Sequence, residues 1–239
     1  METSASPPRT NPWQSATVVD IKRETPRAKT FRFALTVPTA FRAGQHYVVR
    51  LTAADGYSAS RSYSVASAPD QSNEFELTVE RLDGGEVSTF LHDELAIGDE
   101  LDVRGPIGGW FVWDADVPAV LVGGGSGVVP LMAMLRLARR TGRSDLLQLV
   151  VSVRSPDDLF YAGEIGGPET TIVYTRAAPP GFARAPARLS ADDVGPALGT
   201  ARRGYVCGSA AFAEAATGIL VDAGLAPEAI RVERFGPSG

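Results

Sequence analysis

The chain of 239 residues is long enough for one large domain or two ordinary ones with real hydrophobic cores. Hydrophobic residues make up 44% and charged residues 21%, as in a typical globular protein, and the net charge of −5 argues against general nucleic-acid binding. The single cysteine, Cys207, excludes an internal disulfide, a paired-cysteine metal site and a four-cysteine iron–sulfur centre.

The N-terminal residues 1–12 contain no apolar signal core, so we expect a flexible tail on a cytoplasmic protein. Residues 117–135 form an uncharged run with the length of a membrane span. Three consecutive glycines and Pro130 interrupt this run. A strand, a turn and a helix explain it better, and no membrane span is expected.

The first half of the chain has the pattern of short strands. Segments that alternate or are rich in β-branched residues are separated there by glycine or proline. Strands are expected at 15–24, 30–37, 46–51, 61–66 and 74–82, a helix at 86–95, and a further extended segment at 99–111. Many short strands with one helix predict a small antiparallel Greek-key β-barrel.

After Trp113 the pattern changes to strands that alternate with helices. Strands are expected at 119–123, 146–153, 171–175, 204–208 and 230–235, and helices at 128–140, 155–165 and 209–224. This alternation predicts an α/β domain with a doubly wound parallel sheet. The predicted domains are therefore a barrel over residues 13–114 and a nucleotide-type α/β domain over residues 115–239.

A glycine-rich turn follows the first predicted strand of the second domain. Gly125 and Gly127 would let the backbone approach a phosphate, and a helix N-terminus offers free N–H groups. Pro130 stands where a common dinucleotide fingerprint has its third glycine, and proline suits a first helical turn. Such turns also serve tight packing alone, so this motif leaves nucleotide binding open.

The next predicted strand ends on Arg154 and Ser155. NAD-binding folds usually place a carboxylate there to hold the ribose 2′-hydroxyl, whereas a guanidinium and a hydroxyl suit a 2′-phosphate. The sequence thus favours NADPH over NADH, with Arg176 as a second positive charge. The alternative interpretation of Arg154 is a solvated arginine at a strand end.

A second glycine pair, Gly84 and Gly85, precedes the short helix of the barrel domain, and Ser88 lies in its first turn. Backbone N–H groups and a hydroxyl meet there, as an anionic ligand requires. Ordinary capping by Ser88 is the alternative. One anion site in each domain implies two phosphate-bearing ligands that meet between the domains.

Six segments, taken together and in order, resemble the ferredoxin–NADP reductase superfamily, in particular its compact bacterial oxidoreductases. They are RSYSVASAP (61–69), GGEVSTFL (84–91), RGPIGG (104–109), GGGSGVVPLMAML (123–135), YVCGSAAF (205–212) and ERFG (233–236). The resemblance covers nearly the whole chain after residue 13. It implies an NAD(P)H-dependent flavoprotein oxidoreductase whose barrel binds FAD and whose α/β domain binds NADPH, with NADH as the alternative.

The resemblance also implies roles for the strand at 61–66. Arg61 would contact the FAD pyrophosphate, Tyr63 would pack against the isoalloxazine and ribityl, and Ser64 would lie near flavin N5. The pyrophosphate site would be completed by Gly85, Val87 and Ser88. FMN remains an alternative to FAD, because Arg61 could hold a single phosphate.

Near the C-terminus the resemblance implies a reaction centre. The Cys207 thiol would lie beside the nicotinamide, and Gly208 would let that ring approach the backbone. Glu233 would lie near the reacting atoms, and Phe235 would shield the flavin and yield to the nicotinamide. The alternatives are a small buried hydrophobe at Cys207 and a surface carboxylate at Glu233. Plant-type members end in a tyrosine, whereas four residues follow Phe235 here.

The implied reaction moves a hydride from NADPH to FAD and then passes electrons onward. The chain has no cysteines for a fused ferredoxin domain, so we expect a separate acceptor: a ferredoxin, a flavodoxin, or a haem or molybdenum protein. One rival interpretation is an NAD(P)H-dependent reductase of free flavin or quinone. The other is a non-catalytic, flavin-bearing subunit of a larger complex.

An arginine-rich segment offers a docking patch for an acidic carrier, with a solvated helix face as the alternative. Its residues are Arg136, Arg139, Arg140 and Arg143. The two histidines, His46 and His92, have no partners at metal-ligand spacing. We expect both to be structural or surface residues, and we expect no metal site.

Overall fold

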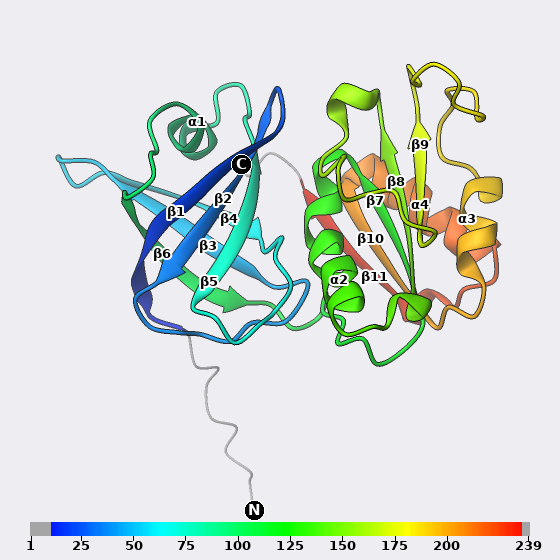
Figure 1. Ribbon diagram of the computed structural model, residues 1–239, viewed down its shortest axis with the longest axis horizontal. Helices are drawn as coiled ribbons and strands as arrows, with labels where there is room; N and C mark the ends of the chain where they lie inside the picture. The colour runs from blue at the N-terminus through cyan, green and yellow to red at the C-terminus, as the bar shows by residue number, and fades with distance from the viewer. Residues whose placement is uncertain (1–10, 236–239) are drawn as a thin grey trace, which may run out of the picture.

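The computed structural model describes residues 11–235, which form two sheet-based units side by side (Figure 1). The expected flexible tail at residues 1–12 lies almost wholly outside the described residues, as do the last four residues of the chain. Within the described range, no helix has both the length and the apolar character that crossing a membrane requires. The uncharged run at 117–135 is a strand, a turn and a helix, as predicted.

The first unit is a six-stranded antiparallel sheet that curls into a barrel. Its spatial order is β4-β3-β6-β1-β2-β5, so β6 lies between strands that precede it in the chain. The bounds are β1 (Trp13–Thr25), β2 (Ala28–Leu35), β3 (His46–Thr52), β4 (Ser58–Ser64), β5 (Glu74–Glu80) and β6 (Glu100–Ile107). A bridge between Val65 and Leu77 joins the two edges of the sheet and closes it. The predicted barrel is confirmed.

Aromatic side chains fill the barrel. Alternate residues of β2 point inward, which buries Phe31 and Phe33 completely. The Phe75 ring stacks on Phe33, with ring centroids 5.4 Å apart, and on Tyr47, with centroids 4.2 Å apart. Helix α1 (Glu86–Asp93) packs against this core (Figure 1).

The second unit is a five-stranded parallel sheet in the order β11-β10-β7-β8-β9. Its strands are β7 (Ala119–Gly124), β8 (Leu147–Val153), β9 (Thr170–Tyr174), β10 (Arg203–Ser209) and β11 (Ile230–Phe235). Its helices are α2 (Val128–Arg140), α3 (Ala191–Leu198) and α4 (Ala210–Asp222). Leu121 and Cys207 share a core with α2, whereas Val122 and Val206 share another with α3 and α4. Helices therefore cover both faces of the sheet, which confirms the doubly wound prediction.

Two elements of the second unit differ from the prediction. The expected helix at 155–165 is a single 3-10 turn, Pro156–Asp158, followed by turns, because Tyr161 adopts a left-handed backbone (φ 57°). Helix α3 was not predicted, since Gly195 and Pro196 weaken its helical pattern. A capping box formed by Ser190 and Asp193 starts it.

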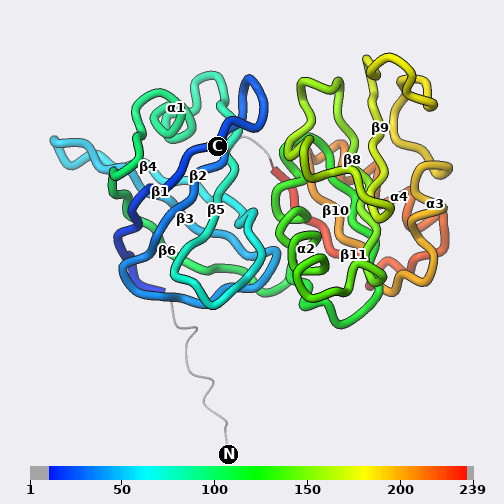
Figure 2. Tube along the Cα trace, in the orientation of Figure 1, coloured from blue at the N-terminus to red at the C-terminus, as the bar shows by residue number. Residues whose placement is uncertain are grey.

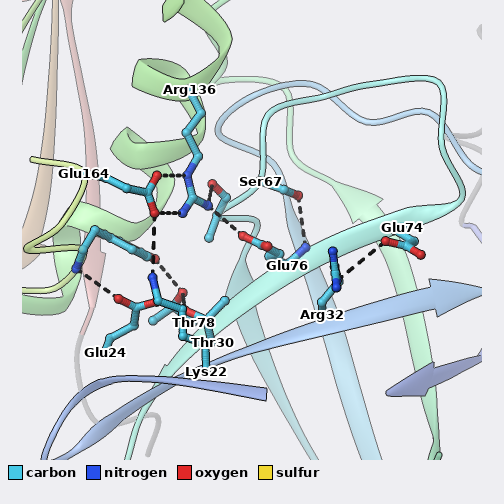
Figure 3. Close-up of polar contacts among 12 residues, drawn as sticks. Lys22, Glu24, Thr30, Arg32, Ser67, Glu74, Glu76, Thr78, Arg136 and Glu164 are labelled. Atoms are coloured by element: carbon cyan, nitrogen blue, oxygen red, sulfur yellow. Dashed lines mark hydrogen bonds and ion pairs between the residues drawn. The ribbon is translucent and has the colours of Figure 1, made fainter. Parts of the chain in front are cut away.

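The Cα trace shows α2 on the side of the second unit that faces the barrel (Figure 2). Arg136 of α2 reaches across and bonds to Glu76 of β5, with 2.7 Å between Nη1 and Oε2. A polar cluster around this pair joins the two units (Figure 3). The helix that follows the glycine-rich turn is therefore also the helix that touches the barrel.

Candidate functional site

The carboxyl ends of three parallel strands meet at one edge of the second sheet. In the register of these strands, Cys207 of β10 pairs with Gly123 of β7 on one side and with Glu233 of β11 on the other. Ligands of open α/β sheets bind at this edge. The fold thus brings the glycine-rich turn, the thiol and the carboxyl group into one row.

The glycines of this turn have two different reasons to be glycine. A Cβ on Gly127 would lie 2.2 Å from the carbonyl oxygen of Cys207, and a Cβ on Gly124 would lie 2.6 Å from the Phe212 ring. Gly125 has a left-handed φ of 55°, and a Cβ there would meet nothing within 4 Å in the described structure. Pro130 is buried in the first turn of α2. Of the predicted contacts, Gly125 faces open space, whereas Gly127 and Pro130 serve packing.

The Cys207 thiol is fully buried. Burial, reinforced by the neighbouring Glu233, raises the pKa of this thiol well above its usual value. Cys207 is therefore a neutral thiol at physiological pH. Gly208 follows it, and a Cβ there would lie 2.7 Å from the Phe212 ring, so the chain is closely packed at this point.

Glu233 carries an unsatisfied carboxyl oxygen. Burial raises the pKa of Glu233 to about 7, and its Oε2 atom has no hydrogen-bond partner within residues 11–235. A carboxyl group in this state holds a proton near neutral pH and can exchange it with a bound ligand. Phe235 lies two residues further along β11, pairs in register with Ser209 and packs against the core beneath α2.

Strand β4 presents a cation and a phenol on the barrel. Arg61 is exposed, donates to the carbonyl of Ser60 (2.7 Å), and forms no ion pair with any described residue. Tyr63 is half-buried against the barrel core, and burial raises its pKa to about 12. Ser64 is buried where the strand ends. Such a strand fits a flavin phosphate at its exposed guanidinium, with the phenol ring alongside.

At the start of α1, the Ser88 hydroxyl already bonds to backbone groups of the preceding turn. Gly85 is the N-cap residue, and within the described structure no side chain caps it. The Ser88 hydroxyl donates to the Gly85 carbonyl (3.1 Å) and accepts from the Leu82 N–H (3.2 Å), and Val87 is buried in the barrel core. An anion at this turn would therefore bind backbone N–H groups rather than the Ser88 hydroxyl.

Arg154 and Ser155 lie together after β8, but a carboxylate already binds both. Asp158 accepts from Arg154 at 2.6 Å and from Ser155 at 2.7 Å. Burial alone would raise the pKa of Asp158, but the hydrogen bonds from Ser155 and Arg154 outweigh it and lower the pKa. The backbone N–H of Arg176 donates to the Arg154 carbonyl (2.9 Å), so the two residues are neighbours through their backbones.

Carboxylates pair with every member of the predicted arginine docking patch. Arg136 pairs with Glu76 and Glu164, Arg139 with Glu169, Arg140 with Asp70, and Arg143 with Asp145. Each partner comes from elsewhere in the fold or from the following turn, so the sequence of the helix alone could not reveal it.

The histidines are structural, as expected. Burial lowers the pKa of His46, which lies in β3. Burial also lowers the pKa of His92, whose Nε2 atom lies 2.9 Å from the Val79 carbonyl.

Sequence reasoning missed two features of this region. Tyr161 inserts between the units, and its hydroxyl lies 2.5 Å from that of Thr78 on β5. The aromatic pair Phe160–Tyr161 was the available signal, but a helical pattern concealed it. The second missed feature is the occupation of Arg154 and Ser155 by Asp158.

Comparison with known proteins agrees with this geometry. Residues 15–112 match the family model of the oxidoreductase FAD-binding domain. The chain is 38% identical over 159 residues to the glycine betaine monooxygenase reductase subunit of Chromohalobacter salexigens, which covers 65% of this chain and 43% of that protein. The chain thus spans less than half the length of this relative.

A second relative matches over most of the chain. It is the ferredoxin–NAD(P)(+) reductase component of the naphthalene 1,2-dioxygenase/salicylate 5-hydroxylase systems of Ralstonia sp, at 29% identity over 93% of this chain and 69% of that protein. A ferredoxin NADP+ reductase from Neisseria gonorrhoeae, solved with bound FAD and NADP, has the same fold (TM-score 0.78, 22% identity, 93% of this chain and 98% of that one). Residues 15–112 thus match an oxidoreductase FAD-binding domain, and the chain as a whole has the two-domain fold of a ferredoxin NADP+ reductase and is similar to the reductase component of an oxygenase system.

Proposed function

We propose that this protein is an NAD(P)H-dependent flavoprotein oxidoreductase that takes a hydride from NADPH and delivers electrons to a separate redox protein. FAD would bind the barrel, residues 13–114, and the nucleotide would bind residues 115–239. The observation that carries the proposal is the row formed by Gly123, Cys207 and Glu233 at the carboxyl edge of the parallel sheet.

The barrel residues would bind and orient the flavin. The Arg61 guanidinium, exposed and without a carboxylate partner among residues 11–235, would bind the pyrophosphate through charge-assisted hydrogen bonds. The Tyr63 ring would pack against the isoalloxazine, Ser64 would lie beside it, and the N–H groups after Gly85 would bind phosphate oxygens. Bound FAD supplies the hydride-accepting ring, and the protein supplies binding and orientation.

Residues of the second unit would align the nicotinamide and manage a proton. The neutral thiol of Cys207 and the backbone at Gly208 would border the nicotinamide, with Phe235 as a displaceable shield. The Glu233 carboxyl, protonated near neutral pH, would hold a proton within this site. By holding the two rings in a reactive orientation, these residues would make the protein's main catalytic contribution.

NADPH is the proposed hydride donor because two arginines, Arg154 and Arg176, are joined through their backbones beside Ser155, just beyond the carboxyl ends of β8 and β9. The Asp158 carboxylate favours NADH instead, because it binds Arg154 and Ser155 where a 2′-phosphate would bind. NADH is therefore the specific alternative.

The acceptor is proposed to be a separate protein. Two relatives are, by their names, reductase parts of oxygenase systems, a glycine betaine monooxygenase and a naphthalene 1,2-dioxygenase. A ferredoxin, a flavodoxin, or a haem or molybdenum protein would suit the chemistry. We further propose a cytoplasmic location, where NAD(P)H and a free thiol such as Cys207 are maintained.

The test is anaerobic titration of the purified protein with NADPH and with NADH. We expect a yellow protein whose extracted cofactor elutes as FAD and whose visible band bleaches on mixing with NADPH. A bound flavin that neither nucleotide bleaches would favour a non-catalytic, flavin-bearing subunit. Reduction of added free flavin or quinone by a protein that retains no flavin would favour the diffusible-substrate reductase.

A further inference from the structure

Arg136 connects the two units from the middle of α2. Its side chain is only 18% exposed, and all of its nitrogens are bonded. Nε and Nη2 donate to the Glu164 carboxylate at 2.9 and 2.6 Å. Nη1 donates to Glu76 at 2.7 Å and to the Ala66 carbonyl at 3.0 Å (Figure 3).

The barrel side of this contact is continuous with the proposed flavin strand. Ala66 follows Ser64 and Val65 at the end of β4, and its N–H donates to the Glu76 carbonyl at 2.8 Å. Arg136 therefore bonds both to the segment that follows β4, through the Ala66 carbonyl, and to β5, through Glu76. Its other partner, Glu164, belongs to the second unit.

The α2 side of the contact is continuous with the glycine-rich turn. Helix α2 begins at Val128, directly after Gly127, and runs without a break to Arg140. A hydrogen-bonded helix transmits a displacement of one end to the other. Any shift of Arg136 relative to Ala66 would therefore move the glycine-rich turn relative to β4.

The contact is built to be rigid. Burial alone would lower the pKa of Arg136, but the Glu164 hydrogen bonds and the charge of Glu76 outweigh it and raise the pKa, so the group stays charged. The guanidinium also lies over the Tyr161 ring, 5.1 Å from its centroid. Truncation of Arg136 would leave Glu76 without an ion-pair partner among the described residues and Glu164 with only the Lys22 ammonium, 3.9 Å away.

We propose that Arg136 is a positioning residue, which fixes the glycine-rich turn against the end of β4 so that the nicotinamide and flavin sites meet. The inference rests on the proposed function, since it assigns these two sites. A displacement of about 1 Å at a reaction centre can lower the rate about 100-fold. Arg136→Met should therefore slow flavin reduction at saturating nucleotide by at least about tenfold and change KM much less.

The chain offers a matched control on the same helix. Arg139 pairs with Glu169 at 2.6 Å and donates to the Glu164 carbonyl at 2.8 Å, and both partners belong to the second unit. Arg139→Met therefore removes a comparable buried pair without touching the barrel. Arg136→Lys keeps the positive charge but loses the planar guanidinium that bonds to Glu76 and Glu164 at once. Its rate of flavin reduction should therefore lie between those of Arg136→Met and the unmodified protein.

The first measurement is stopped-flow reduction of the holoprotein for each variant. The second is the distance between two spin labels on introduced cysteines, Asp55→Cys on the barrel and Asp222→Cys on α4, both exposed positions. The buried Cys207 would not compete for the label. Arg136→Met should broaden or shift this distance distribution, whereas Arg139→Met should leave it narrow.

The proposal would be overturned if Arg136→Met left the label distance distribution unchanged and kept the flavin reduction rate within about twofold of that of the unmodified protein. Equal effects of Arg136→Met and Arg139→Met would also overturn it, because they would indicate general destabilisation. If Arg136→Met does not fold, the Arg136→Lys series decides by the same criteria. The label distance needs no nucleotide chemistry, so failure of the proposed reductase function would be recognised separately, by the absence of bleaching in the unmodified protein.

Discussion

Glu233 illustrates what a single buried carboxyl does to a protein at neutral pH. Its pKa of about 7 lies above the usual value of 4.5, so the folded state binds this proton more tightly than the unfolded chain. The resulting stabilisation is fully present below pH 4.5 and is lost as the pH rises through about 7. The same proton affinity that suits a reaction centre therefore costs stability in mildly alkaline solution.

We expect Glu233→Gln to remove this part of the pH dependence, because an amide does not ionise. Urea unfolding from pH 4.5 to above 7 would measure this pH dependence. The free energy of unfolding of the variant should rise relative to that of the unmodified protein as the pH increases. Glu214→Gln, an exposed site on α4, is the control. Parallel curves for the unmodified protein and Glu233→Gln would show that the carboxyl is not held protonated.

Asp158→Asn should raise the preference for NADPH. The substitution removes the negative charge that binds Arg154 and Ser155, which frees both for a 2′-phosphate. Loss of this partly buried charge should raise the NADPH/NADH ratio of kcat/KM by about three- to tenfold. Asp157→Asn, at an exposed neighbouring position, should leave the ratio unchanged.

Arg154→Glu supplies the complementary test and should abolish any NADPH preference. Binding of 2′,5′-ADP compared with 5′-AMP gives a readout that needs no turnover. If Asp158→Asn and Arg154→Glu leave the two affinities in the same ratio, other residues recognise the 2′-phosphate.

Arg61→Ala should weaken FAD binding by about 10- to 100-fold, as expected for the loss of a charge-assisted hydrogen bond to a phosphate. Fluorescence titration of the apoprotein with FAD would measure the dissociation constant. Arg23→Ala, at another exposed arginine of the barrel, is the matched control. Unchanged affinity in Arg61→Ala would remove this guanidinium from the flavin site.

Among the elements, those with a strong periodic pattern were predicted best. The bounds of α2 and β11 match the sequence prediction residue for residue, because α2 is a long apolar stretch that ends on two arginines and β11 alternates apolar with charged residues. The segment at 155–165 was predicted wrongly, because its pattern is helical while its conformation is set by a partner distant in sequence. Tyr161 bonds to Thr78, 83 residues earlier, and takes a left-handed backbone to do so.

The turn between β7 and α2 leads to a prediction at this scale. Gly127→Ala should cost about 2–3 kcal/mol of unfolding free energy, because the new Cβ would overlap the Cys207 carbonyl. Gly125→Ala should cost only about 1 kcal/mol, the penalty of a left-handed backbone in open space. Urea denaturation of both variants would compare them, and equal costs would contradict the separation of packing from open glycines.

At the scale of the whole molecule, the sequence predicted the two units but not the side-chain contacts that join them. The edge that unites Cys207 and Glu233 could be predicted, because the carboxyl ends of parallel strands must meet at one edge. The arginines of α2 were interpreted as a docking face because their carboxylate partners come from other parts of the chain. Arg136 lies 60 residues from Glu76 in sequence, and such pairings have no local signature.

Because Cys207 is buried, its reactivity reports local opening of the sheet edge that surrounds it. A neutral, inaccessible thiol reacts with an alkylating reagent only during the moments when the surrounding edge separates. The rate of modification by iodoacetamide thus reports the frequency of these openings without any added probe. Ligands that seal the edge should lengthen the lifetime of the unmodified thiol in proportion to their occupancy.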